Sequence, residues 1–219
     1  GASPAIMGSW SAPDRSADDH RGPDLAPSLA PIFSFVSGPR QLVAHGVRKR
    51  IALPSQDGED GAGVLQTAVG QALANAVAAG LDNPMIVGAV PFDPAEPCCL
   101  YVPEHTQWQT GDGASAQAQP LDVPLLSRTS LPEQDGFKQA VEHAIVNFGF
   151  GTIDKVVLSV IEQLTFGGTV DPARLMANLR AQNRDGHHFH LTLPDGSALL
   201  GVSPELLVRK QGGRILTNP

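Results

Sequence analysis

Apolar residues recur at two different spacings along this chain, and the spacings separate helices from strands. Three- and four-residue spacing over residues 65–77, ended by Gly80, predicts a helix. The same spacing predicts a second helix over about 133–148, and Asp171-Pro172 marks the start of a third that continues to about residue 183. Because residues 64–79 contain no charged side chain, we expect the first helix to be largely covered.

Shorter apolar runs bounded by Gly and Pro predict strands between these helices. They lie within residues 32–53, at 85–90, at 98–102 and in one long strand at 154–166, and an alternating meander follows over 188–217. Residues 104–120, rich in Gln, Gly, Ala and Ser, are interpreted as a surface excursion. Since helices and strands are mixed without regular alternation, the expected fold class is α+β.

Residues 1–31 differ from the rest of the chain in amino-acid composition. Five prolines stand there among Ser, Ala, Asp and Gly, and no periodic apolar face accompanies them. We therefore expect a flexible N-terminal lead-in over 1–31 and a folded portion over 32–219.

Composition favours a folded protein with a small-molecule partner. Of the 219 residues, 42% are apolar and 17% are charged, which is enough for a sizeable core. Fifteen Lys and Arg against 22 Asp and Glu give a net charge of −7, which argues against nucleic acid or an anionic membrane as partner. Apolar stretches are far shorter than the roughly 20 residues that span a bilayer, so a cytoplasmic protein is expected.

The two cysteines, Cys98 and Cys99, are adjacent in the sequence. Neighbouring cysteines rarely form a disulfide because the peptide between them must distort, which fits a reducing compartment. A soft-metal site is the functional alternative, but no third cysteine completes it. Two small residues in an extended segment are the favoured interpretation.

The histidines near the end of the chain invite a metal hypothesis. His188 and His190 project from the same face of a predicted strand. Two imidazoles make half a zinc site, and no carboxylate or thiol follows at a matching spacing. We therefore favour a polar strand face over a metal site.

Two charged residues stand out by their context. Lys155 precedes an apolar run, and Glu205 follows Ser203-Pro204 at a predicted strand end. Burial lowers the pKa of a lysine and raises the pKa of a glutamate, so covered groups of these types can transfer protons at neutral pH. Composition alone favours surface ion pairs for both residues.

Four stretches carry motifs that occur together in one enzyme family. They are NPMIVGAVPFDP at 83–94, LYVPE at 100–104, DKVVLS at 154–159 and LLGVSPELL at 199–207. With these motifs in family order, the sequence resembles the chorismate-utilising enzymes, specifically the isochorismate synthases of catechol siderophore pathways. The resemblance implies the N-terminal part of a two-lobed fold like that of anthranilate synthase component I, with large, mainly antiparallel sheets and flanking helices.

The same resemblance implies an Mg²⁺-dependent conversion of chorismate to isochorismate. Lys155 would be the general base that activates water for attack at ring carbon C2, and Glu205 the general acid that protonates the departing C4 hydroxyl. In this family, a lysine at the position of Lys155 distinguishes enzymes that use water as nucleophile. Mg²⁺ would hold the ring carboxylate of the substrate.

The chain departs from the family pattern in two places. Val160 stands where an arginine is usual, and relatives continue beyond Pro219 into a second half that carries the acidic metal ligands. We therefore assign no metal ligand in this chain, expect the C-terminal half of the same domain as its partner, and expect the 219 residues alone to be inactive. A salicylate synthase of the same family and a non-catalytic pseudoenzyme or scaffold portion remain as alternatives.

Overall fold

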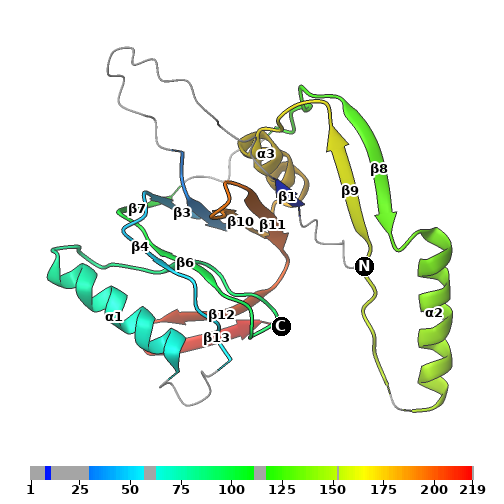
Figure 1. The fold of residues 1–219 in the computed structure, drawn as a ribbon, viewed down its shortest axis with the longest axis horizontal. Helices are drawn as coiled ribbons and strands as arrows, with labels where there is room; N and C mark the ends of the chain where they lie inside the picture. Colours follow the sequence, from blue (N-terminus) through cyan, green and yellow to red (C-terminus); the bar gives the residue numbers. More distant parts are fainter. Residues whose placement is uncertain (1–7, 11–29, 57–62, 111–116, 152, 219) are drawn as a thin grey trace. The chain divides into compact units, whose positions relative to one another are not determined.

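A computed structural model describes residues 8–10, 30–56, 63–110, 117–151 and 153–218 (Figure 1). The chain divides into two units. Unit 1 contains Pro120–Asp171, and unit 2 contains the described residues before Pro120 and from Pro172 onward. Both units mix helices and antiparallel strands, which confirms the predicted α+β class.

The larger sheet of unit 2, here sheet A, has six antiparallel strands in the order β1-β11-β10-β2-β3-β7. The strands are β1 (Gly8–Trp10), β2 (Phe33–Ser37), β3 (Arg40–His45), β7 (His105–Thr110), β10 (His187–Thr192) and β11 (Ala198–Ser203). Strand β1 lies within the predicted lead-in, of which residues 1–7 and 11–29 are outside the described residues. Strand β7 lies within the predicted surface excursion, so that interpretation is wrong for residues 105–110.

The smaller sheet, here sheet B, has the strand order β4-β6-β5 and carries helix α1 on one face. Its strands are β4 (Lys49–Ile51), β5 (Val87–Ala89) and β6 (Cys99–Val102), and α1 spans Val64–Ala78. The expectation that α1 is largely covered is wrong. Only Ala72 and Ala76 are buried, whereas Val64 and Val77 are 55% and 60% exposed, because one side of the helix alone packs on the sheet.

Strand β6 is buried on both faces. On one face, Leu100 and Val102 pack with Ile51 against α1, and Cys98 belongs to the same cluster. On the other face, Tyr101 packs against Leu42, Ala44 and Leu191 of sheet A. The Tyr101 hydroxyl donates a hydrogen bond to the carbonyl oxygen of Thr192 in β10 at 3.0 Å, which ties the two sheets together. Burial raises the pKa of Tyr101, so the phenol keeps its proton and remains a donor.

Sheets A and B meet at a bulged corner. Strand β3 pairs with β7 and strand β4 pairs with β6, so one long antiparallel ladder runs through both sheets. The register places the three residues 46–48 opposite the two residues 103–104, and this extra residue bends the ladder. Gly46 fits here because its φ of 69° is left-handed and a Cβ would lie 2.5 Å from a Glu104 carboxylate oxygen.

Helix α3 (Pro172–Gln182) packs on β10 and β11 of sheet A. Strands β12 (Leu206–Gln211) and β13 (Arg214–Asn218) form a separate hairpin. Its Arg209 guanidinium donates a hydrogen bond to the Ser37 hydroxyl of sheet A at 3.2 Å. The predicted third helix and terminal meander are therefore both present.

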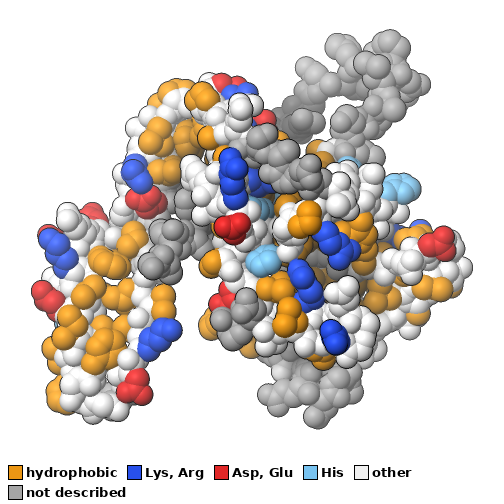
Figure 2. All heavy atoms as spheres, turned by 180° about the vertical axis from the view of Figure 1, so that it is seen from behind, with side chains coloured by type: hydrophobic (Ala, Val, Ile, Leu, Met, Phe, Trp, Pro, Cys, Tyr) orange, Lys and Arg blue, Asp and Glu red, His pale blue; other side chains and the backbone are white. Residues whose placement is uncertain are grey.

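Unit 1 consists of β8 (Leu125–Leu131), α2 (Gln134–Gly149) and β9 (Ile161–Phe166), with β8 paired to β9. The Arg128 guanidinium donates two hydrogen bonds to the Glu162 carboxylate across this pair, at 3.1 and 2.6 Å. No residue of α2 is buried, and apolar side chains such as Leu126, Phe150 and Val157 are exposed. Figure 2 shows hydrophobic side chains spread over the surface of this unit.

We predict that Gly88→Ala in β5 destabilises unit 2 by about 2 kcal/mol, because Gly88 has a φ of 145° and a Cβ would lie 2.0 Å from the carbonyl oxygen of Cys99. Urea unfolding would measure the loss. The control is Gly70→Ala in α1, where a Cβ meets nothing within 4 Å and where alanine should add about 0.5–1 kcal/mol of stability. Equal stability of the Gly88→Ala variant and the parent chain would contradict this account of β5.

Candidate functional site

Glu205 lies in the short connection between β11 and β12 of unit 2, and Ser203 fixes its backbone. The Ser203 hydroxyl donates to the carbonyl oxygen of Glu205 at 2.7 Å and accepts from the Glu205 backbone N–H at 3.2 Å. Pro204 between them restricts the backbone further. The Glu205 side chain is exposed, so the structure does not provide the partial burial considered for it from sequence.

Lys155 lies in unit 1, in the connection between α2 and β9. The predicted long strand over 154–166 is wrong for its first half, since β9 begins only at Ile161 and residues 153–160 have no strand partner. Lys155 is exposed, and so are the neighbouring side chains of Val156 and Val157. Val160, where the resemblance led us to expect an arginine, is 44% exposed. Lys155 and Glu205 belong to different units, and the structure gives the surroundings of each separately.

The three histidines of β10 differ in their surroundings. Among the described residues, no group of three or more His, Cys, Asp or Glu side chains is placed to hold a metal ion. His188 is 3% exposed, and neither of its ring nitrogens has a hydrogen-bond partner there. His187 instead stacks on Phe35, with ring centroids 6.1 Å apart, and its Nδ1 lies 2.9 Å from the Ser37 hydroxyl.

The environment of His188 favours the neutral imidazole. Burial under α3 lowers its pKa, and the positive charge of Arg180 acts in the same direction. The nearby backbone of Asn183 and Leu179 favours the protonated ring and so partly offsets the lowering of the His188 pKa. It forms no well-aligned hydrogen bond with either ring nitrogen. Burial also lowers the pKa of His190.

The cysteines are free thiols in different surroundings. Cys98 is buried beside α1, and burial raises the pKa of its thiol. Cys99 is partly buried and donates its S–H to the Tyr101 hydroxyl oxygen at 3.4 Å. Both thiols therefore have packing or hydrogen-bonding roles within sheet B, as expected for small residues in an extended segment.

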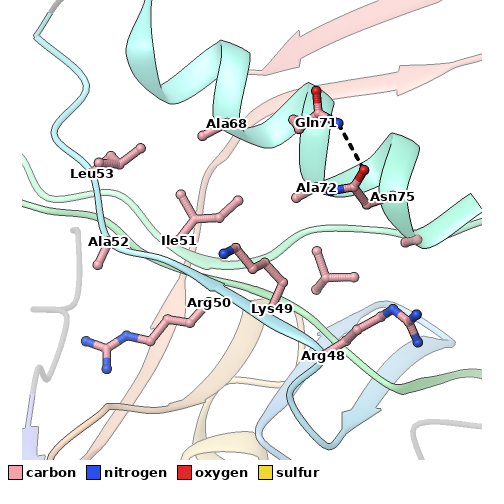
Figure 3. Close-up of a pocket in the computed structure, with 12 residues that line it drawn as sticks. Arg48, Lys49, Arg50, Ile51, Ala52, Leu53, Ala68, Gln71, Ala72 and Asn75 are labelled. Atoms are coloured by element: carbon pink, nitrogen blue, oxygen red, sulfur yellow. Dashed lines mark hydrogen bonds between the residues drawn. The ribbon is translucent and has the colours of Figure 1, made fainter. Parts of the chain in front are cut away.

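Unit 2 also has a groove of about 580 Å³ between β4 and α1 (Figure 3). Basic residues 48–50, apolar side chains and two helix amides line it, and neither proposed proton-transfer residue is among them. This groove was not predicted from the sequence. The available signal was the run Arg48-Lys49-Arg50 followed by alanines at four-residue spacing in α1, but only the packing of α1 on β4 brings these features together.

Comparison with known proteins gives a consistent family. The sequence profile of the family described as chorismate binding enzyme matches residues 52–219. Isochorismate synthase EntC of Escherichia coli K12 is 38% identical over 199 residues, which cover 88% of this chain and 50% of EntC. Isochorismate synthase DhbC of Bacillus subtilis is 30% identical over 196 residues, which cover 85% of this chain and 48% of DhbC.

Solved structures give the same result for the fold. The 2,3-dihydroxybenzoate-specific isochorismate synthase DhbC of Bacillus anthracis superimposes with a TM-score of 0.70 at 28% identity, over 86% of this chain and 48% of that protein. The menaquinone-specific isochorismate synthase MenF of Escherichia coli superimposes with a TM-score of 0.63 at 23% identity, which supports the fold alone. The chain spans about half the length of the curated relatives it matches.

The buried histidine generates a pH prediction. The pKa of His188 is lowered from 6.5 in the folded chain, so the unfolded chain binds a proton first as pH falls. The free energy of unfolding should therefore decrease as pH drops below about 6.5. Urea unfolding at pH 8 and pH 5.5 would measure the decrease in the free energy of unfolding between the two pH values. The decrease should be smaller in His188→Leu. Part of it should persist in that variant, because burial also lowers the pKa of His190.

The matched control is His105→Asn, which changes an exposed histidine of β7 and should leave the difference between the two pH values unaltered. A His188→Leu variant with the full pH dependence of the parent chain would show that the buried imidazole is not its source.

Proposed function

Because the chain belongs to the family of chorismate binding enzymes, we propose that it forms one half of an isochorismate synthase. The observation that carries the proposal is 38% identity to an isochorismate synthase over 88% of the chain. The proposed substrate is chorismate and the proposed product isochorismate. The chain is similar to a 2,3-dihydroxybenzoate-specific relative, which supports the proposal that its product enters a siderophore pathway.

The proposed reaction is an allylic displacement that needs a proton-transfer group at each end. Water attacks ring carbon C2 while the hydroxyl at C4 departs, and the ring double bond shifts between the two carbons. Water is a poor nucleophile and hydroxide a poor leaving group, so a base must accept a proton from the attacking water and an acid must protonate the leaving oxygen. One water enters and one water leaves, so substrate and product are isomers.

We assign the base to Lys155 and the acid to Glu205. Lys155 must be neutral before the reaction and Glu205 protonated, and both states are favoured when the groups are covered. In this chain both side chains are exposed. The proposal therefore requires the rest of the enzyme to cover them, and the hydrogen bonds between Ser203 and the Glu205 backbone support a defined position for the acid.

The proposed metal is Mg²⁺, which would neutralise and orient the substrate carboxylate when bound. Mg²⁺ prefers oxygen ligands, commonly one or two carboxylates together with water and substrate oxygens. The described part of the chain contains no group of three or more His, Cys, Asp or Glu side chains placed to hold a metal ion, and we assign none of its residues as a ligand. The proposal places those ligands in the half of the enzyme that this chain does not span.

The proposed partner is that other half. Exposed apolar side chains of unit 1, including Leu126, Ile145 and Phe148, form the kind of surface that a folded protein normally covers. The matched relatives are about twice as long as the region of similarity, which leaves enough chain to supply such a cover. None of the described helices is long and apolar enough to cross a membrane.

The first test is the mass of the purified protein together with its turnover of chorismate with and without Mg²⁺. Isochorismate formation that requires both Mg²⁺ and a longer or second polypeptide supports the proposal. Salicylate as the final product would identify a salicylate synthase instead. A complete protein that turns over no chorismate would indicate a pseudoenzyme, for which Val160 is the feature in favour.

Lys155→Ala and Glu205→Gln, each made in the complete enzyme, should lower kcat by a factor on the order of 10² to 10⁴ because each removes one proton-transfer group. In the 219-residue chain alone, the unfolding midpoints of both variants should stay close to that of the parent chain, since both side chains are exposed there. The control is Lys138→Ala on α2, which should leave turnover unchanged. Full activity in either test variant would remove that residue from the mechanism.

Ser203→Ala should lower kcat less, by about tenfold, because the acid remains while its backbone loses two hydrogen bonds. The alkaline limb of the pH profile, where a general acid loses its proton, should persist in this variant and disappear in Glu205→Gln. Restoration of turnover in Ser203→Thr, which keeps the hydroxyl, would separate positioning from a general loss of stability. Unchanged turnover in Ser203→Ala would contradict the positioning role.

A further inference from the structure

The groove between β4 and α1 is open because the facing surface of the helix is made of alanines. Ala68, Ala72 and Ala76 recur every four residues and so lie on one side of α1. Their methyl groups leave a space of about 580 Å³ beside β4, within the range of pockets that hold small molecules. Strand β4 is the first strand in the order of sheet B, so the described residues place no further strand against its outer edge.

The floor of the groove is apolar. Ile51 and Val102 of sheet B are buried beneath it, together with Ala72 and Ala76 of the helix. No glycine contributes to the lining, so the backbone amide cradle that binds bare phosphate groups is absent from it. An occupant of this groove needs an apolar body to replace water on the floor.

The rim of the groove is positively charged. Arg48, Lys49 and Arg50 are all exposed, and no acidic residue is among the lining residues. In Figure 3 the Lys49 side chain points from β4 toward α1, while those of Arg48 and Arg50 leave the strand in other directions. No carboxylate of the described residues forms an ion pair with Arg48, Lys49 or Arg50. In a chain of net charge −7, this local excess of positive charge is a specific feature.

The helix side of the rim offers two amides. The Gln71 side-chain N–H₂ donates to the Asn75 side-chain oxygen at 2.9 Å, which holds both groups in place (Figure 3). This arrangement leaves the Asn75 N–H₂ available as a donor at the rim. The groove therefore combines an apolar floor, one cation aimed across it and an ordered pair of amides.

We propose that this groove binds a small organic anion, with a carboxylate held by Lys49 and an apolar ring or chain resting on Ile51, Ala72 and Ala76. The donor amide of Asn75 supplies a second polar contact for the ligand. Neither Lys155 nor Glu205 lines the groove, so the inference goes beyond the proposed function and does not depend on it.

The test is titration of the isotope-labelled 219-residue chain with benzoate, followed by the chemical shifts of backbone amides. Benzoate should shift the amides of β4 and α1 with a dissociation constant of about 1 mM, as expected for a small ligand with one charged contact. Benzamide, which has the same ring without the charge, should bind at least about tenfold more weakly. Inorganic phosphate, which lacks the apolar body, should not shift these amides.

Two variants localise the effect. Lys49→Gln should weaken benzoate binding about tenfold, and its exposed position makes the fold insensitive to the change. Ala68→Leu should abolish binding by filling the groove while keeping the charge of Lys49, and leucine is well tolerated in helices. Lys138→Gln on α2 is the matched control and should bind benzoate as the parent chain does.

The proposal is overturned by any of three results. One is the absence of shifts in β4 and α1 at saturating benzoate, or shifts confined to residues around Glu205. Another is equal binding of benzoate and benzamide. The third is unchanged affinity in both Lys49→Gln and Ala68→Leu. Because the readout is binding at named amides, these results are independent of chorismate turnover.

Discussion

Unit 2 depends on the burial of strand β6 on both of its faces. The side chains of Leu100 and Val102 fix helix α1 to sheet B, and Tyr101 on the opposite face fixes sheet B to sheet A. The same short strand therefore sets the position of the α1 groove and of β10, whose partner strand β11 ends two residues before Glu205. A polar residue at 100 or 102 would leave an unpaired group in a closed interface, whereas Tyr101 is tolerated because Thr192 accepts its hydrogen bond.

Much of this fold can be predicted from the sequence where one periodicity dominates. The helices at 65–77, 133–148 and 172–183 and the strand at 98–102 were predicted because their apolar spacing is regular. Strand β7 was missed because its sequence is polar, and its pairing with β3 rather than its own pattern makes it a strand. The opposite error concerns residues 154–160, which have strand-like composition but no partner among the described residues.

In the candidate site, too, features set by a local sequence motif could be predicted, whereas features that depend on distant segments could not. Lys155 and Glu205 were selected through the family motifs around them, and composition alone would have left them as surface charges. Composition correctly predicted their exposure, and the partial burial considered for proton transfer is absent from this chain. Burial depends on which segments pack over a side chain and not on its neighbours in sequence. The Ser203 contacts to Glu205 are local and lie within a three-residue motif, whereas the groove beside Lys49 needs two segments that only folding brings together.

The bulged corner at Gly46 also has a consequence for how this unit folds. Since β3–β7 and β4–β6 form one continuous ladder, pairing Ile51 with Leu100 closes the long loop that contains α1 and β5. The entropy of closing that loop is lost once, and the pairs from Lys49–Val102 out to Arg40–Thr110 can then form successively without closing another loop of that size. The nucleus that sets the folding rate of both sheets is thus expected at the α1 end of the ladder, and the corner transmits its register from one sheet to the other.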